Sequence, residues 1–111
     1  MSAGLLFLLQ RGTAILLAPL VLVHLGVVLY AVRGGLDAAE ILARTRGSLF
    51  WAGFYGLFVL AVSVHASIGL RAVLAEWTGL RGRAVDTAAL AVALLLLLLG
   101  MRAVWAVVGA P

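Results

Sequence analysis

Three long apolar stretches, separated by short polar segments, dominate the chain. The longest uncharged runs are 12–32, 47–70 and 87–101, and the last of them is followed by only one charged residue, Arg102. A hydrocarbon core of about 30 Å needs about 20 helical residues at about 1.5 Å of rise each. The pattern therefore predicts an all-α membrane protein. It has one transmembrane domain over 1–111, with three spanning helices near 5–32, 47–75 and 84–108.

The two polar connections differ in what they predict. The first, "RGGLDAAEILARTRGS" (33–48), opens with a Gly-Gly turn and then interleaves apolar with charged residues. This spacing predicts a short amphipathic helix lying at the membrane interface in the first loop. The second, "EWTGLRGRAVD" (76–86), is brief and contains glycine, and we expect Asp86 or Thr87 to cap the third helix.

Composition narrows the chemistry that is possible. Hydrophobic residues make up 66% of the 111 residues and charged residues 11%, far from the balance of soluble domains. Cysteine is absent, which excludes disulfides, thiolate-held clusters and haem attached through Cys-x-x-Cys-His, so metal chemistry would use histidine. The net charge of +4 comes from arginines scattered at helix ends, which favours contact with anionic membrane lipid over nucleic acid.

The second span carries a histidine and an arginine near its end, in "SVHASIGLRAVLAEW" (63–77). Ala61 and Gly69 lie one helical turn on either side of His65, and such small residues leave space for a flat macrocycle. Arg71 lies roughly 9 Å further along the axis, a reach that suits a haem propionate. The alternative is a histidine bonded to a neighbouring helix, with Arg71 extending to lipid headgroups.

The first span also contains polar side chains. Arg11 lies slightly below the interface beside Thr13, where a small headgroup with carbonyl oxygens could accept its hydrogen bonds. The alternative role for Arg11 is an interfacial anchor. His24 lies nearer the far end, and the bulky neighbours Leu20 and Val28 make it a weaker haem candidate than His65.

In these positions the sequence resembles the cytochrome b membrane-anchor subunits of succinate dehydrogenase and fumarate reductase, the complex II family. That family's second helix carries His-x-x-x-Gly-x-Arg with an acid a few residues later. Here His65, Gly69 and Arg71 match, with Glu76 where aspartate is usual. Ala72 stands where a second histidine often follows the arginine.

The resemblance extends to the first helix, where the family carries Ser-x-x-His-Arg-x-Ser/Thr. Arg11 and Thr13 remain in this chain, whereas Phe7 replaces the serine and Gln10 replaces the histidine. The lost serine is a residue that helps to hold ubiquinone in the family. A shifted quinone pocket or a different quinone would be consistent with this change.

The resemblance implies a non-catalytic subunit of a succinate:quinone oxidoreductase-type complex in the bacterial inner (cytoplasmic) membrane. It implies haem b with His65 as axial ligand to the iron, Gly69 making room, and Arg71 on a propionate. It also implies a quinone substrate contacted by Arg11 and Thr13. The expected partners are a flavoprotein, an iron–sulfur subunit and a second membrane anchor that supplies the other axial ligand.

Two other functions are considered. A haem-free structural anchor would keep the fold and lose the cofactor. A small transporter of the multidrug type would need an acidic residue in mid-span, whereas the four acids lie at or outside the predicted span ends; they are Asp37, Glu40, Glu76 and Asp86.

Overall fold

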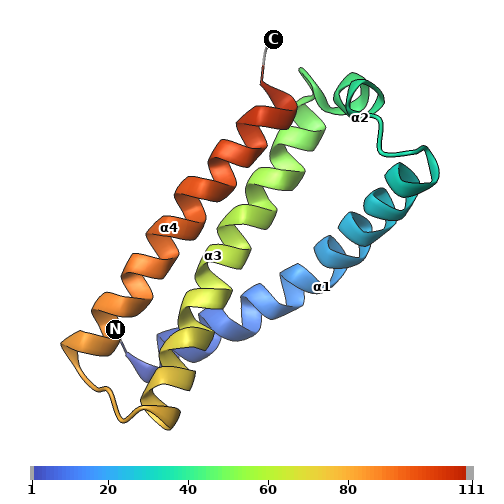
Figure 1. Ribbon diagram of the computed structural model, residues 1–111. Helices are drawn as coiled ribbons and strands as arrows, with labels where there is room; N and C mark the ends of the chain where they lie inside the picture. The colour runs from blue at the N-terminus through green and yellow to red at the C-terminus, as the bar shows by residue number, and fades with distance from the viewer. Residues whose placement is uncertain (1, 110–111) are drawn as a thin grey trace.

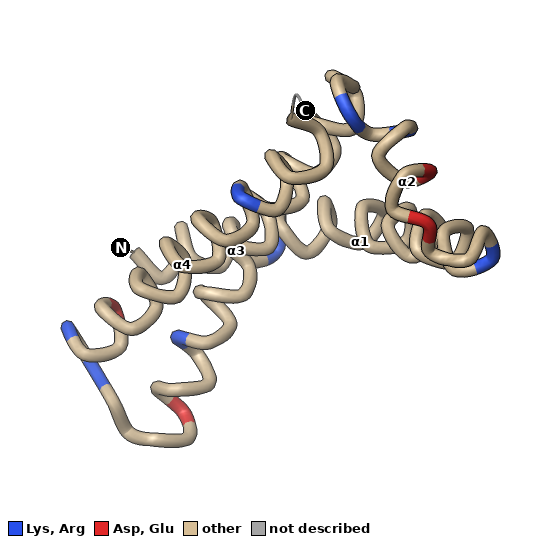
Figure 2. The backbone as a smooth tube through the Cα atoms, turned by 45° about the horizontal axis from the view of Figure 1, so that its top comes forward, with Lys and Arg blue, Asp and Glu red and all other residues tan. Residues whose placement is uncertain are grey.

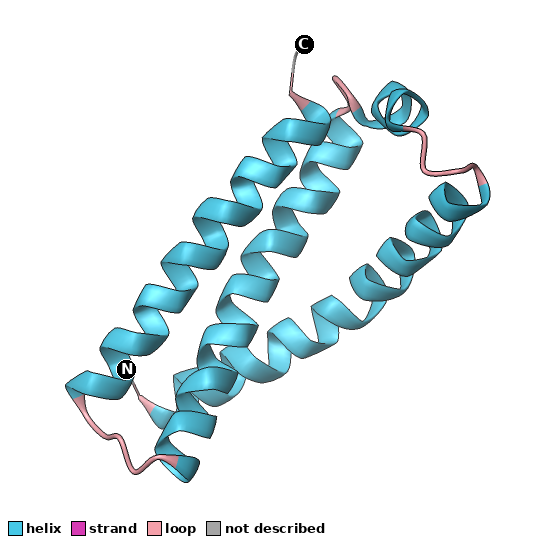
Figure 3. Ribbon diagram, viewed as in Figure 1, coloured by secondary structure: helices cyan, strands magenta, loops and turns pink. Residues whose placement is uncertain are grey.

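The computed structural model describes residues 2–109 and consists of four helices. They are α1 (Ala3–Arg33), α2 (Ala38–Thr45), α3 (Leu49–Trp77) and α4 (Arg83–Val108). Figure 1 shows α3 and α4 side by side and antiparallel, with α1 on the other side of α3. Helices and loops account for all of the described residues, and none of them forms a strand (Figure 3).

The three long helices, α1, α3 and α4, are each able to cross a membrane. They contain 31, 29 and 26 residues, and all three are long and apolar enough to span. Charged residues are concentrated towards the helix ends and the connections, leaving long uncharged stretches between them (Figure 2). The chain is thus a multi-pass membrane protein, and the predicted span limits agree with the observed ones to within two residues.

The short helix in the first loop is confirmed as α2, and it is tied to the end of α4. The hydroxyl of Thr45 donates to the carbonyl oxygen of Val107 at 2.6 Å, and the amide of Gly47 donates to that of Val108 at 2.9 Å. Helix C-termini leave their last carbonyls without partners inside the helix. The connection therefore satisfies carbonyls of α4 and fixes α2 beside it.

Side-chain caps begin each of the described helices except α4. The side chains of Ser2, Asp37 and Ser48 each accept a backbone amide hydrogen bond at the start of their helices. The prediction that Asp86 or Thr87 caps the third span is wrong. The helix begins earlier, at Arg83, after Gly82 at a φ of 63°, a left-handed conformation that glycine adopts without strain.

Most of the apolar surface of the helices is not covered by the chain itself. Only 11%, 17% and 0% of the most apolar segments of α1, α3 and α4 are buried. Large exposed side chains such as Leu8, Leu22 and Leu98 stand along the spans. Lipid or partner chains must cover this surface.

Candidate functional site

His65 lies at the interface between α3 and α1. Its ring is half-buried, and its Nδ1 is 3.1 Å from the hydroxyl oxygen of Thr13. The same hydroxyl lies 2.7 Å from the carbonyl oxygen of Leu9, one turn earlier in α1. The imidazole therefore has a fixed partner on a neighbouring helix, while its Nε2 makes no hydrogen bond within residues 2–109.

The face of α3 at Gly69, one turn after His65, is also turned towards α1. A Cβ atom added to Gly69 would lie 3.4 Å from Nε2 of Gln10, so the amide of Gln10 occupies the space beside the glycine. Ala61 is buried, with 4% of its surface exposed. The room expected next to the small residues is thus partly taken by α1, and the site residue that the sequence reasoning missed is Gln10.

Gln10 carries an unpaired polar atom at this position. Its Oε1 is buried and has no hydrogen-bond partner among the described residues. Buried polar atoms normally find partners, so this oxygen remains free to accept a hydrogen bond from a group outside the described residues. Gln10 and Thr13 are three residues apart and His65 and Gly69 are four apart, so each pair lies about one turn apart on one face of its helix, and this shared spacing was the available signal.

Arg71 faces a different direction from His65. Six positions along a helix correspond to about 600°, which places the two side chains about 120° apart around α3. The Nε of Arg71 donates to Oδ1 of Asp86 at 2.9 Å, joining the end of α3 to the start of α4. The two side chains are 36% and 60% exposed, so this ion pair contributes at most about 1 kcal/mol. The sequence reasoning did not identify Asp86 as the partner of Arg71.

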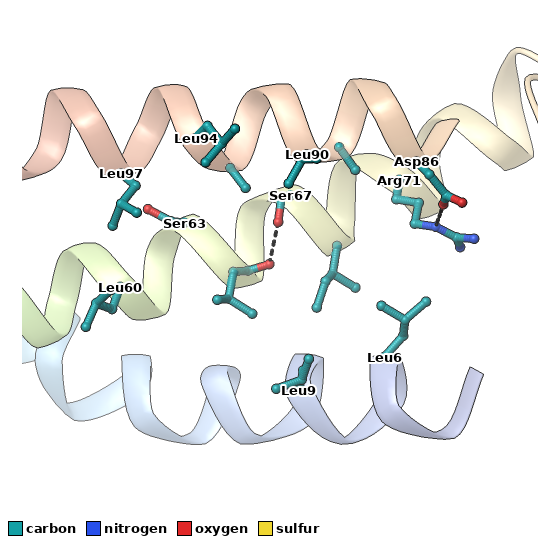
Figure 4. A pocket seen from close by; sticks show the side chains of 14 residues that line it. Leu6, Leu9, Leu60, Ser63, Ser67, Arg71, Asp86, Leu90, Leu94 and Leu97 are labelled. Atoms are coloured by element: carbon teal, nitrogen blue, oxygen red, sulfur yellow. Dashed lines mark hydrogen bonds and ion pairs between the residues drawn. The ribbon is translucent and has the colours of Figure 1, made fainter. Parts of the chain in front are cut away.

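A groove of about 480 Å³ lies between α1, α3 and α4, with the Arg71–Asp86 pair at one end (Figure 4). Its walls are largely leucine side chains from all three helices. Ser63 and Ser67 also line it, but their hydroxyls donate to the carbonyl oxygens of Val59 and Val64 in their own helix. The groove is therefore an apolar slot with one charged end, and His65 does not line it.

Arg11 points away from this interior. It follows Gln10 by one position, about 100° around α1, and its side chain is exposed, with the guanidinium carbon 5.8 Å from the centre of the Phe7 ring. Thr13 lies about 200° around the helix from Arg11 and contacts His65. The structure thus separates the two residues predicted to hold the quinone.

His24 belongs to a separate region. Its ring lies edge-on to Tyr55 and Phe58, at centroid distances of 6.1 and 5.3 Å, beside a second groove of about 320 Å³. Phe58 precedes His65 by seven residues, which is about 10 Å along α3. The two histidines therefore lie at different depths and face different neighbours.

Within residues 2–109, no three His, Cys, Asp or Glu side chains gather into a group that could hold a metal ion by themselves. A haem iron makes a smaller demand, because the macrocycle supplies four nitrogens and each axial position takes one protein ligand. A single imidazole per chain is sufficient for that donor set. His65, with a free Nε2 and a held Nδ1, meets this requirement.

Comparison with known proteins adds one finding. The family model of the succinate dehydrogenase/fumarate reductase transmembrane subunit matches residues 2–107. Neither a curated protein nor a solved structure gave a significant match. The matched segment covers α1, α2 and α3, and all of α4 except its last residue.

Proposed function

The chain belongs to the succinate dehydrogenase/fumarate reductase transmembrane subunit family, and on that premise we propose that it is a haem-binding cytochrome b anchor. With partner chains it would carry electrons between the iron–sulfur clusters of a peripheral dehydrogenase and a membrane quinone. The observation that carries the proposal is the half-buried His65, whose Nδ1 is held by Thr13 and whose Nε2 is free within the described residues. A bound haem would supply a one-electron carrier inside the membrane.

The residues present fit half of a haem site. His65 would supply one nitrogen to the iron, and the amide nitrogen of Gln10 lies beside Gly69, one turn away from His65. A second ligand to the iron would come from a histidine of a second membrane anchor, because His24 lies about 10 Å away in depth. The terminal amino groups of Arg71 remain available to a propionate, since only its Nε is bonded to Asp86 in the described part of the chain.

Arg11 is the proposed quinone contact of this chain. Its exposed guanidinium carries several donors, which suits the carbonyl oxygens of a quinone headgroup. Because Arg11 points outward, the rest of the quinone site would come from neighbouring subunits. The partners we assign are a flavoprotein subunit, an iron–sulfur subunit and the second anchor, and the location is the bacterial inner membrane.

Absorbance spectra of the purified complex test the proposal. The wild-type complex is expected to show a reduced b-type band, and His65→Ala is expected to abolish it. His24→Ala serves as the matched control, because it removes the other histidine of the chain and should leave the haem content of the complex unchanged.

Each alternative function predicts a different haem content in these complexes. A wild-type complex that retains its dehydrogenase but lacks the band would identify the chain as a haem-free anchor and refute the proposal. Loss of about half of the haem in His24→Ala would show a two-haem anchor in which both histidines are ligands. Unchanged haem in His65→Ala would remove His65 from the iron.

A further inference from the structure

We infer that Thr13 is a positioning residue for His65, accepting a hydrogen bond from its Nδ1–H and thereby presenting a bare Nε2 to the haem iron. This inference rests on the proposed function for the identity of the metal group, and on the structure for the hydrogen bond. It gives Thr13 a role different from the quinone contact that the sequence motif implies.

Proton counting sets the direction of the bond. A threonine hydroxyl has one proton and two acceptor lone pairs. The carbonyl oxygen of Leu9 lies 2.7 Å from this hydroxyl and can only accept, so it takes the proton. The 3.1 Å contact with His65 then requires the ring nitrogen to donate, which places the ring proton on Nδ1.

This tautomer is the one that a ligand needs. A neutral imidazole carries one N–H and one lone pair, and the nitrogen that binds a metal must be the one without the proton. With the proton on Nδ1, the lone pair is on Nε2, the atom that has no partner within residues 2–109. The hydroxyl therefore selects both the tautomer and the orientation of the ring.

The threonine is itself rigidly held. Its branched Cβ restricts χ1, and the bond to Leu9 fixes the hydroxyl on the face of α1 that contacts α3. Both residues are half-buried in an apolar span, where an N–H without an acceptor is costly because it loses its hydrogen bond to water. The hydrogen bond is consequently favoured over rotation of the ring away from α1.

Loss of the hydroxyl should alter the properties of the iron. Metal-bound histidines usually donate their other N–H, and that bond increases the basicity of the ligand. Greater basicity stabilises the oxidised iron. Thr13→Val, which keeps the shape and removes the hydroxyl, should therefore shift the haem towards the reduced form, by up to about tenfold in the redox equilibrium, or about 59 mV.

Two measurements test the inference, each made on wild type, Thr13→Val and Thr13→Ser. The first is ¹⁵N NMR of the full-length, histidine-labelled chain in micelles without haem, with His24→Gln used to assign the two histidines. The Nδ1–H form of His65 is expected in wild type and Thr13→Ser and should be depleted in Thr13→Val. The second is potentiometric titration of haem in the assembled complex, where Thr13→Val should raise the midpoint potential and Thr13→Ser should restore it.

Several results would overturn the inference. One is a Thr13→Val chain with wild-type tautomer and midpoint. Another is an unchanged haem with a raised quinone KM, which would make Thr13 the quinone contact. A wild-type complex without haem would refute the proposed function instead, and the NMR comparison would still decide whether the hydrogen bond exists.

Discussion

At Gly100, α4 packs tightly against Val59 of α3, and replacing this glycine should weaken the packing of the two helices. A Cβ atom at Gly100 would lie 2.5 and 2.9 Å from the two methyl carbons of Val59, and 3.2 Å from its Cβ. Valine cannot rotate out of the way, because its branched side chain is restricted in χ1 and would still present a methyl group. We therefore expect Gly100→Ala to push the two helices apart.

The expected loss of stability in Gly100→Ala combines a packing cost with a gain in helix propensity. Overpacking of a well-packed interface typically costs about 1–3 kcal/mol, whereas Gly→Ala in an open helical position gains up to about 1 kcal/mol from helix propensity. Gly56 in α3 has open space around its missing Cβ, so Gly56→Ala measures the propensity gain alone. Gly100→Ala should be less stable than Gly56→Ala by about 1–3 kcal/mol.

The assay is unfolding of the purified chain in mixed micelles with increasing SDS, followed by tryptophan fluorescence. Trp105 lies five residues after Gly100 on α4, so it reports on the helix that must move. The double variant Val59→Ala with Gly100→Ala should recover part of the loss, because the two methyl groups are removed. Equal stability of Gly100→Ala and Gly56→Ala would refute the reasoning, as would a double variant less stable than Gly100→Ala.

Two further predictions concern the charged residues. Arg11→Ala should lower quinone reductase activity by roughly tenfold to a hundredfold, because a charged hydrogen bond of about 1.5–3 kcal/mol is lost. Dye-linked dehydrogenase activity and haem content should stay unchanged. Unchanged quinone kinetics would make Arg11 an interfacial anchor. Arg71→Leu should lower the haem midpoint potential and Asp86→Asn should raise it, each by about 1 kcal/mol or less after solvent screening, because each variant leaves the opposite charge of the pair unbalanced. Shifts of the same sign in potentiometric titrations would contradict this account.

The fold was predictable because its main determinant is local. Apolar length fixes the number of spans, and the interleaved charges of 36–46 distinguish α2 from a coil. The cap of α4 was assigned wrongly because capping residues were sought among side chains, whereas the N-cap residue is Gly82, which offers no side-chain hydrogen bond. A glycine that starts a helix is hard to tell from a glycine in a loop.

The site was predictable in its residues and less so in their arrangement. His65 could be identified from its position in an apolar span, and the structure places it against α1. The partners Thr13, Gln10 and Asp86 come from other helices, and pairing between helices depends on rotation that single-helix spacing does not fix. From the sequence, His65 and Arg71 were assigned to one haem site. Their side chains lie about 120° apart around α3 and contact different neighbours.

The arrangement of polar groups around α1 suggests how one helix serves two adjacent sites. Thr13 and Gln10 face α3 and lie against His65 and Gly69, while Arg11 lies on the opposite side of α1 from Thr13. Under the proposed function, the inner side fixes the iron ligand and the outer side binds the quinone, with less than about 5 Å of helix axis between the two levels. Because both sides belong to one rigid helix, their relative position is held without a loop. A neighbouring subunit is then needed only to complete each half-site.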